Sequence, residues 1–379
     1  MPGTLADPVW FWQRIVSPHM AGLAEALARS GRPVTYVAEQ PMSDSRAKQG
    51  WMPAKAEAMT LQFAPDAAAA VGLVAEAPET SIHICQGFRG NGIVSAARTA
   101  LDQRGLRQWV VMETIEERGW ASSRLKRLEY ARLMRRWRHR IDGVLAIGHS
   151  TPAWLAARGM LADRIVPFAY FLPEKTAPTR PERSKDAPFR VLFVGQFIER
   201  KRIDLLIDAL ARLAGHPFEL LVVGAGPLEA ELQQRAKTRL GDRVTWLGQR
   251  PMHEIQAIMA EADCLVLPSR HDGWGAVVSE ALMAGTPAIC SDRCGAAGVV
   301  EASGEGGVFK VGDVEALADK LSMALRSGRV TAERRQSIRH WSRCLGADAG
   351  AKFLNEILVS NKSGEPRPVP PWHRDVIPI

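Results

Sequence analysis

The feature that most constrains the fold is an alternation of short, β-branched apolar runs with longer stretches of helical character. Strands that alternate with helices form parallel sheets whose crossover connections are helical. The sequence therefore predicts an α/β protein with two successive series of strands. The first series is 11–16, 34–38, 82–85, 109–112 and 143–147, and the second is 191–194, 220–223, 244–247, 264–268 and 288–291.

The length of the chain fits two domains rather than one. Its 379 residues are 46% hydrophobic and 24% charged, which is typical of a globular protein. Residues 165–190 are rich in Pro, Lys and Arg and have no clear period, which is typical of a linker. We expect an N-terminal domain over 1–172, a C-terminal domain over 173–350, and a segment over 351–379 that is a candidate to pack back on the N-terminal domain.

The apolar runs are too short to cross a membrane. None approaches the roughly 18 residues that a spanning helix needs, and the N-terminus lacks the charged start and apolar core of a secretory signal. Five scattered cysteines, without zinc or redox spacing, favour buried or idle thiols. These features predict a cytoplasmic protein.

The formal charge of +8 is concentrated in one run. From Arg124 to Arg140 there are eight Arg or Lys residues, opposed only by Glu129. Leucines and Trp137 recur in this run at helical spacing, which predicts a basic amphipathic helix. Three explanations stay open: a solvated helix face, peripheral contact with the anionic lipids of the cytoplasmic membrane, and nucleic-acid binding, for which no supporting motif occurs.

The segment HDGWGAVVSEALMAGTP, residues 271–287, has two carboxylates eight positions apart, Asp272 and Glu280. It follows a predicted strand and leads into a predicted helix. Ligands of open parallel sheets lie at the carboxyl ends of strands, and the N–H groups of a helix N-terminus attract anions. The segment is therefore either a phosphate seat between two hydroxyl-binding acids or a capped helix with an ordinary glutamate.

Two earlier strand ends carry similar loops. Gly195 is followed by Arg200 and Lys201, two cations that can neutralise a diphosphate without a metal. The next strand ends in Gly224-Ala225-Gly226-Pro227, a Gly-x-Gly turn that is weak evidence by itself.

Taken in order, VGQFIERKRIDLLIDAL, VGAGPLEAEL, VTWLGQRP and PSRHDGWGAVVSEALMAGTPAICSD resemble the retaining glycosyltransferases of family 4. The resemblance covers about residues 189–300. It implies the GT-B fold, in which two Rossmann-like domains face each other across a cleft. It also implies transfer of a sugar from a nucleoside diphosphate sugar, with retention and without a metal or other cofactor.

The resemblance also implies roles for single residues. Lys201, Arg200 and Asp272 are the catalytic candidates, with the two cations on the diphosphate and Asp272 on the donor sugar. The donor would also contact Glu280, through its ribose, and the residues Gly195, Gly224, Gly226, Gly273, Trp274, Gly275 and Ala276. The chain departs from the family pattern where Asp272 replaces the usual glutamate, where Gln196 replaces an arginine, and where Arg202 replaces a glycine.

Candidates for the acceptor side come from loops after strands of the first half. They are His19, Arg89 and Glu113, which we expect to face the cleft. The acceptor itself is expected to be a lipid-linked or surface-polysaccharide glycan. The alternatives are a nucleotide-sugar epimerase of the same fold, which needs no acceptor, and a non-catalytic protein that binds sugar nucleotides. No nucleic-acid partner is expected.

Overall fold

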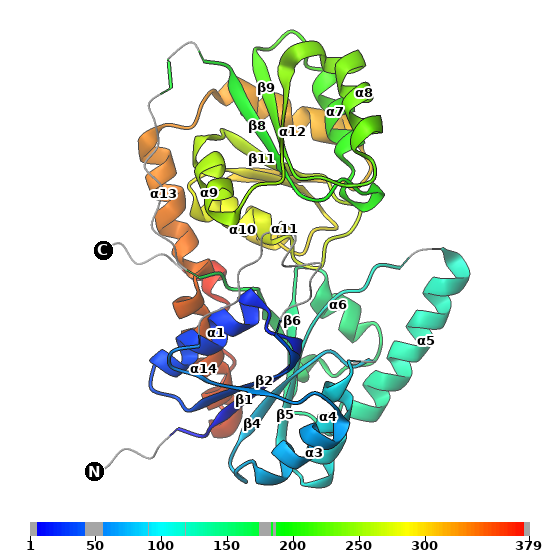
Figure 1. Ribbon diagram of the computed structural model, residues 1–379, viewed down its shortest axis with the longest axis vertical. Helices are drawn as coiled ribbons and strands as arrows, with labels where there is room; N and C mark the ends of the chain where they lie inside the picture. Colours follow the sequence, from blue (N-terminus) through cyan, green and yellow to red (C-terminus); the bar gives the residue numbers. More distant parts are fainter. Residues whose placement is uncertain are drawn as a thin grey trace. The chain divides into compact units, whose positions relative to one another are not determined.

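The computed structural model describes residues 6–41, 56–89, 91–117, 119–173, 183–184 and 187–374. It divides into two compact units, both drawn in Figure 1. The first unit contains the described residues up to Pro173 together with Gly346–Arg374, and the second contains the described residues from 183 to Leu345. The chain therefore leaves the first unit after Pro173 and returns to it at Gly346.

The first unit is built on a parallel sheet with the order β3-β2-β1-β4-β5-β6-β7 in the described part of the chain. The strand order reverses between β1 and β4, which is the mark of a doubly wound sheet. The strands are β1 (Val9–Ile15), β2 (Val34–Gln40), β3 (Thr60–Phe63), β4 (Ile82–Gln86), β5 (Arg107–Glu113), β6 (Gly143–Ile147) and β7 (Ile165–Phe168).

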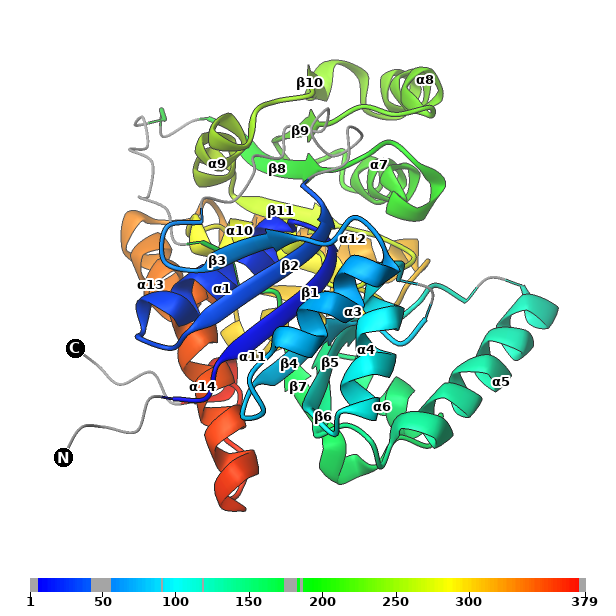
Figure 2. The ribbon, with the colours of Figure 1, turned by 60° about the horizontal axis from the view of Figure 1, so that its bottom comes forward.

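Helices pack on this sheet through apolar side chains. Apolar side chains of α3 and α4 pack on buried residues of β1, β2 and β4, and those of α5 pack on buried residues of β5 and β6. Figure 2 shows α3 and α4 lying over these strands. The helices of the unit are α1 (Pro18–Arg29), α3 (Ala67–Glu76), α4 (Ile93–Gln103), α5 (Trp120–Trp137), α6 (Thr151–Ala156) and α14 (Ala347–Ser363), with 3-10 turns η1 (Ala162–Arg164) and η5 (Pro371–His373).

The returning segment completes the first unit. Helix α14 packs against α1, and the Phe353 ring stacks on Phe168 with ring centroids 5.8 Å apart. Gly350 lets Phe171 approach, since a Cβ there would lie 2.2 Å from the Phe171 ring. A hydrogen bond of 2.8 Å from the Ala347 N–H to the Leu172 carbonyl joins the segment to the end of the unit's first part.

A buried histidine lies between strands of the first sheet. The Trp12 indole N–H donates to His83 Nδ1 at 3.0 Å, and His83 Nε2 lies 2.8 Å from the Ser81 hydroxyl. The ring is therefore neutral, with its proton on Nε2. Burial and the positive charge of Arg104 lower the pKa of His83 from its ordinary value to about 3.

The second unit has a parallel sheet with the order β10-β9-β8-β11-β12-β13 among the described residues. Its order reverses between β8 and β11. The strands are β8 (Phe189–Val194), β9 (Phe218–Val223), β10 (Val244–Gly248), β11 (Cys264–Leu267), β12 (Ala288–Ser291) and β13 (Gly306–Phe309). The helices are α7 (Ile203–Ala211), α8 (Glu229–Leu240), α9 (Met252–Glu261), α10 (Ala276–Met283), α11 (Ala297–Ser303), α12 (Val314–Ser327) and α13 (Ala332–Ser342), with 3-10 turns η2 (Glu199–Lys201), η3 (Gly241–Arg243) and η4 (Arg343–Leu345).

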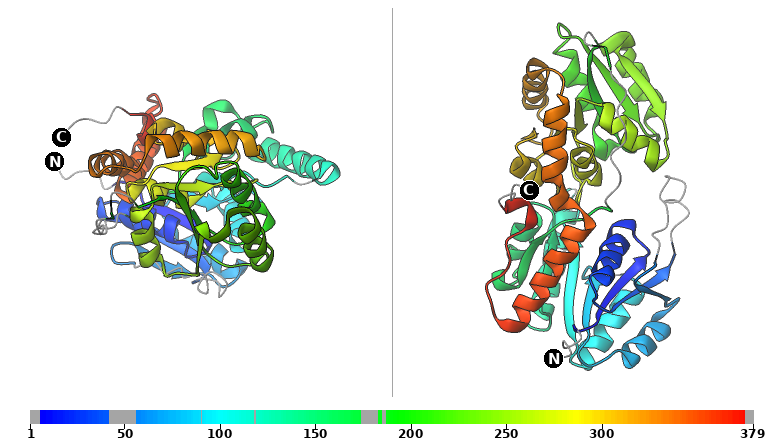
Figure 3. Two further views of the ribbon diagram at one scale, coloured as in Figure 1. Left: turned by 90° about the horizontal axis from the view of Figure 1, so that it is seen from above. Right: turned by 90° about the vertical axis from the view of Figure 1, so that its left-hand side faces the viewer.

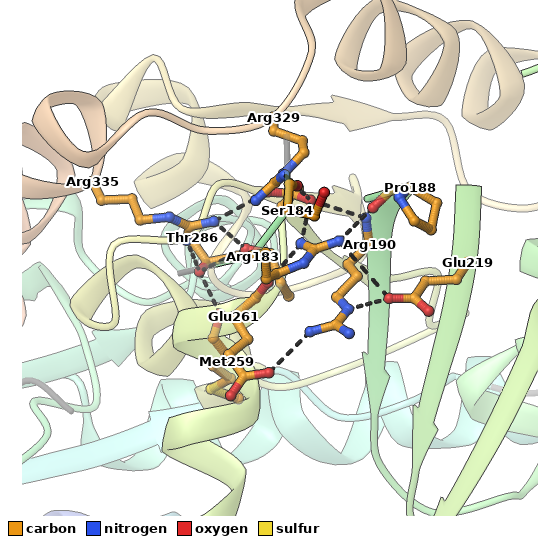
Figure 4. A network of polar contacts seen from close by, with 12 residues as sticks. Arg183, Ser184, Pro188, Arg190, Glu219, Met259, Glu261, Thr286, Arg329 and Arg335 are labelled. Carbon is orange, nitrogen blue, oxygen red and sulfur yellow. Dashed lines mark hydrogen bonds and ion pairs between the residues drawn. The ribbon is translucent and has the colours of Figure 1, made fainter. Parts of the chain in front are cut away.

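Arginines from distant parts of the second unit converge on one buried carboxylate, Asp263. Arg183 donates to Asp263 Oδ2 at 2.9 Å, and Arg335 donates to Oδ1 at 3.2 Å. The backbone N–H of Arg190 adds a third hydrogen bond, of 3.0 Å. Figure 4 shows Arg183, Arg190, Arg329 and Arg335 gathered in this network. Arg183, near the start of the second unit, and Arg335, near its end, therefore bind the same carboxylate.

All ten predicted strands are present, but the linker prediction is partly wrong. Residues 165–168, expected to be linker, form the edge strand β7, in which Ile165, Val166 and Phe168 are buried. Pro167 is exposed there, as a proline in an edge strand should be. Residues 174–182 and 185–186 of the predicted linker lie outside the described residues. Strands β3 and β13 were not predicted.

No helix in the described part of the chain is both long and apolar enough to cross a membrane. The five cysteines are free, and four of them are buried.

Candidate functional site

The carboxyl ends of β8 and β11 are neighbours because the two strands pair in parallel. Their loops carry most of the predicted donor-binding residues. A hydrogen bond of 2.8 Å from the Arg270 N–H to the Arg200 carbonyl joins the two loops directly. The structure thus brings together residues that are about 70 positions apart in the sequence.

The contact at the centre of this site is an ion pair between Lys201 and Asp272. The Lys201 Nζ lies 2.6 Å from Asp272 Oδ2, and both side chains are largely buried. Arg200 adds a second positive charge, with Nη1 3.9 Å from the same oxygen and 2.7 Å from the His271 carbonyl. All three candidate catalytic residues therefore lie in one cluster, at the end of η2 and at the start of the turn before α10.

Arg202, which follows Lys201, adopts a left-handed conformation with φ 54°. It is the only non-glycine residue with positive φ among the described residues. This is the position where the sequence departs from a family glycine. The guanidinium holds the conformation locally, since Arg202 Nη2 pairs with Asp204 Oδ2 at 3.0 Å. Arg202 therefore turns away from the ion pair and into the first turn of α7.

The turn before α10 requires glycine at position 275. Gly275 has φ 84°, and a Cβ there would lie 2.6 Å from Cys294 Sγ and 2.8 Å from Leu267 Cδ2. Gly275 is the N-cap of α10, so no side chain caps the helix, and its first turn contains no acidic residue. The Val278 N–H donates to the Gly275 carbonyl at 2.9 Å, so the first-turn N–H groups that an anion can use are those of Ala276 and Val277, at the positive end of the helix dipole. Glu280 follows Ala276 by one helical turn and lies on the same face.

A second segment, residues 291–296, supports this turn, and the sequence analysis missed it. We call it the backing segment. Asp272 donates its N–H to the Arg293 carbonyl at 3.1 Å and accepts from the Gly295 N–H at 2.9 Å. The Trp274 carbonyl accepts from the Ala296 N–H at 2.7 Å. A Cβ on Gly295 would lie 1.9 Å from the Gly273 carbonyl oxygen, so only glycine allows this approach.

Trp274 packs inside the turn before α10. Its side chain is buried, and the indole N–H donates to the Ser279 hydroxyl at 3.1 Å. The only polar group of the side chain is therefore already used within the protein, and it fixes the turn against the first part of α10. Whether Trp274 contacts a donor stays a prediction. Its apolar ring gave no sequence signal that separates packing from ligand contact.

The predicted glycines after β8 and β9 have a packing role. A Cβ on Gly224 would lie 1.9 Å from the Gly195 carbonyl oxygen, and one on Gly226 would lie 2.5 Å from the Phe197 carbonyl oxygen. The loops after the two strands are further joined by a hydrogen bond of 2.9 Å from the Phe197 N–H to the Ala225 carbonyl. The glycines thus hold the loop that carries Lys201 close to the sheet.

Cys290 and Cys294 lie behind the turn as buried thiols. Hydrogen bonding with Cys294 and burial raise the pKa of Cys290 well above its ordinary value. Cys294 Sγ also lies 3.2 Å from the Trp274 carbonyl oxygen. Cys290 is therefore a packing group rather than a nucleophile, and the buried Cys294 packs beside it.

The candidates of the first unit lie at the carboxyl ends of neighbouring strands in its sheet. His19 follows β1, Arg89 follows β4 and Glu113 ends β5, three strands that are neighbours in the sheet order. His19 stacks on Tyr170, with ring centroids 5.4 Å apart. Arg89 Nε pairs with Glu129 of α5 at 2.8 Å. Whether these residues contact an acceptor stays a prediction.

Among the residues that the structure describes, no three His, Cys, Asp or Glu side chains gather as a metal-binding group. The prediction that no metal is required is tested by experiment below.

The chain is similar in sequence to known glycosyltransferases. Residues 175–341 match the family model described as Glycosyl transferases group 1. A 2-deoxystreptamine glucosyltransferase of Streptomyces kanamyceticus is 32% identical over 170 residues, covering 40% of this chain and 43% of that protein. A GDP-mannose-dependent alpha-(1-6)-phosphatidylinositol dimannoside mannosyltransferase of Mycobacterium tuberculosis is 31% identical over 186 residues, covering 47% of each. The chain spans about half the length of these curated relatives.

Solved structures resemble the whole chain. The lipopolysaccharide outer core galactosyltransferase WaaB superposes with a TM-score of 0.70 at 19% identity, covering 93% of this chain and 99% of that one. Anabaena HepE in complex with UDP gives a TM-score of 0.70 at 17% identity, covering 93% and 100%. At these identities the likeness concerns the fold, and together with the two parallel sheets it confirms the predicted α/β fold of two Rossmann-like units. The match to the glycosyl transferases group 1 model covers residues 175–341, which make up most of the second unit.

Proposed function

We propose that this chain is a glycosyltransferase that transfers a sugar from a nucleoside diphosphate sugar to a hydroxyl group of a glycan acceptor. The observation that carries the proposal is the placement of Lys201, Arg200 and Asp272 beside the uncapped N-terminus of α10. The family match over residues 175–341 supports it.

The donor's diphosphate would bind at the first turn of α10. There its oxygens would accept hydrogen bonds from the N–H groups of Gly275 and Ala276, and Lys201 and Arg200 would supply positive charge. Lys201 is already positioned by its ion pair with Asp272, so little ordering is required when the donor arrives. Asp272 would then accept from sugar hydroxyls, and Glu280, one turn further along α10, from the ribose.

In the proposed reaction the bond between the anomeric carbon and the phosphate oxygen breaks, and a bond to the acceptor oxygen forms on the same face of the sugar. The proton of the acceptor hydroxyl passes to an oxygen of the leaving diphosphate. The main contribution of the protein is electrostatic stabilisation of that leaving group by Lys201, Arg200 and the α10 N-terminus. Because these groups supply the positive charge, a divalent metal is not required. Retention and metal independence are both parts of the proposal.

The acceptor we propose is a lipid-linked or surface-polysaccharide glycan, used at the cytoplasmic side of the membrane. The names of several relatives support this choice. They include the phosphatidylinositol dimannoside mannosyltransferase above and a putative colanic acid biosynthesis glycosyltransferase of Escherichia coli, which is 27% identical over 203 residues.

The test is thermal-shift binding of UDP-, GDP-, TDP- and ADP-sugars in the presence of EDTA. We expect stabilisation by one base class, loss of that stabilisation in Glu280→Ala, and no loss in the control Glu231→Ala, which removes an exposed carboxylate from α8. A donor excess of 100 times Kd stabilises by about 2.7 kcal/mol. A folded protein that responds to none of the donors refutes the assignment of residues 271–280 as a donor site.

Turnover then separates the proposed transferase from its alternatives. A transferase releases the nucleoside diphosphate in the presence of acceptor. An epimerase changes the donor sugar without any acceptor, and a non-catalytic binding protein shows the thermal shift alone. Product stereochemistry at the anomeric carbon, read by NMR, tests retention.

A further inference from the structure

The candidate donor site holds a negative charge among its positive ones. In the part of the chain that the structure describes, Asp272 is the only carboxylate within ion-pair distance of Lys201, at 2.6 Å, or of Arg200, at 3.9 Å. The two cations come from the green part of the second unit and the carboxylate from its yellow part, as the chain is coloured in Figure 3. A carboxylate beside a proposed phosphate seat repels the phosphates, so its presence requires an explanation.

The carboxylate is held close to the first turn of α10. The Asp272 backbone is fixed by two hydrogen bonds, of 3.1 Å to the Arg293 carbonyl and 2.9 Å from the Gly295 N–H. A Cβ on Gly275, the N-cap of α10, would lie 3.8 Å from Asp272 Cγ. Because the aspartate side chain is short and its backbone is fixed, its charge stays beside the seat unless the whole turn rearranges.

Lys201 can bind a phosphate without leaving Asp272. Its ammonium group has three N–H donors, and one of them donates to Asp272 Oδ2 at 2.6 Å. The other two can reach phosphate oxygens. The ion pair therefore need not break when a diphosphate binds, and the negative charge of Asp272 acts on the diphosphate for as long as it is bound.

The two diphosphates of the proposed reaction differ in how strongly this charge affects them. A nucleoside diphosphate sugar carries two negative charges. The free nucleoside diphosphate carries nearly three at neutral pH, because its terminal phosphate loses a second proton near pH 6. The sugar also has hydroxyl groups that can donate to the Asp272 carboxylate, and the free diphosphate has no such groups. Asp272 therefore disfavours the free diphosphate through greater repulsion and through the missing hydrogen bonds.

We propose that Asp272 selects the nucleoside diphosphate sugar over the free nucleoside diphosphate, and thereby promotes release of the diphosphate after transfer. This inference rests on the proposed function and gives a second role to one of its residues. When the sugar has been transferred, the carboxylate loses its hydroxyl partners. The diphosphate gains its additional negative charge as soon as the proton from the acceptor passes to water.

The test is isothermal titration calorimetry of the full chain in the presence of EDTA. The ligands are the donor that gives the largest thermal shift, among the UDP-, GDP-, TDP- and ADP-sugars, and its free nucleoside diphosphate. In Asp272→Asn, which keeps the shape of the side chain, the Kd of the free diphosphate should fall about tenfold, because one repelling charge is removed from a partly screened site. The Kd of the donor should stay within about threefold, since weaker repulsion and a weaker hydrogen bond to the sugar oppose each other.

Three further variants serve as controls. Asp272→Glu keeps the charge, and Glu231→Gln removes an exposed carboxylate from α8, so both should keep the ratio of the two Kd values within about threefold of the parent chain. Asp272→Ser is a second neutral variant, in case Asp272→Asn does not fold, and it should also bind the free diphosphate more tightly. The gain in both neutral variants should shrink between about 0.05 M and 0.5 M salt, because it is electrostatic. A packing role for Asp272 would not produce this salt dependence.

Two outcomes would overturn this inference and leave the proposed function intact. One is unchanged or weaker binding of the free diphosphate to folded neutral variants. The other is a gain in Asp272→Glu as large as that in Asp272→Asn. If the folded parent chain bound none of the donors and none of the free diphosphates, the proposed function would be refuted, and this inference with it.

Discussion

Replacing Asp263 with alanine should destabilise the second unit more than any other single change of a charged residue proposed here. The Asp263 side chain is completely buried. It accepts hydrogen bonds from Arg183, from Arg335 and from the backbone N–H of Arg190. Burial already lowers the pKa of Arg183, and Asp263 is the group that compensates for the charge. Without the carboxylate, two largely buried guanidinium groups lose their nearest counter-charge, and Arg183 keeps only the more distant Glu219, at 3.9 Å.

The magnitude follows from these contacts. Removing one partner of a buried ion pair costs about 3–5 kcal/mol, because an uncompensated charge remains buried. By contrast, the pair between Arg212 and Glu315 is exposed on both sides, and Glu315→Ala should cost below about 1 kcal/mol. Arg183 and Arg335 share Asp263, so Asp263→Ala combined with Arg335→Ala should cost less than the sum of the single variants.

Native-state hydrogen exchange in increasing urea is the appropriate assay, because the two units need not unfold together. The amides of β8 and β11 should lose about 3–5 kcal/mol of protection in Asp263→Ala, and those of β4 and β5 should change little. A loss below 1 kcal/mol in β8 and β11, or strict additivity in the double variant, would refute the reasoning.

Three further changes test other parts of the structure. Lys201→Met should lower kcat/KM by about 10²–10³-fold if Lys201 stabilises the leaving diphosphate, and Lys201→Arg should recover part of the rate. Equal rates in the parent chain and both variants would contradict the assigned role. Gly275→Ala should abolish the donor-induced thermal shift, because it combines a strained φ with a Cβ 2.6 Å from Cys294 Sγ. The control Gly241→Ala, where φ is 63° but the space is open, should keep the shift. Retention of the shift in Gly275→Ala would show that the turn can rearrange. The stability of the first unit should fall on acidification below pH 6.5, because the unfolded chain then binds a proton that folded His83 does not take up until about pH 3. By pH 5 the loss from this group should be about 2 kcal/mol in urea unfolding, and His83→Phe should remove it from the pH dependence; an unchanged slope would contradict a neutral buried ring.

The strands were predictable from the sequence because buried parallel strands are short continuous apolar runs. The two missed strands differ from this pattern: β3 (TLQF) is partly exposed, and β13 (GGVF) begins with two glycines. The linker error has a related cause. Pro167 and the prolines that follow it suggested a loop, but Pro167 occupies an edge strand, where no backbone N–H is needed on the open side.

The candidate site was predictable only at the level of loops. Because parallel strands end at one sheet edge, the sequence placed Lys201 and Asp272 in the same region, but it gave no sign that they form an ion pair. The backing segment was missed because its support comes from backbone groups of Arg293, Gly295 and Ala296, whose side chains carry no recognisable signal. Likewise, nothing in the spacing of Leu125 and Trp137 shows that one is exposed and the other buried.

The discontinuity of the first unit has a consequence for synthesis on the ribosome. Helix α14, whose Phe353 covers Phe168, is synthesised after all the described residues of the second unit. Until then the apolar side chains that α14 will cover stay open to solvent or to chaperones. The described residues of the second unit, 183–345, all precede α14 and can close in the meantime. We therefore expect the first unit, although its synthesis starts first, to become protease-resistant on the nascent chain after the second unit does.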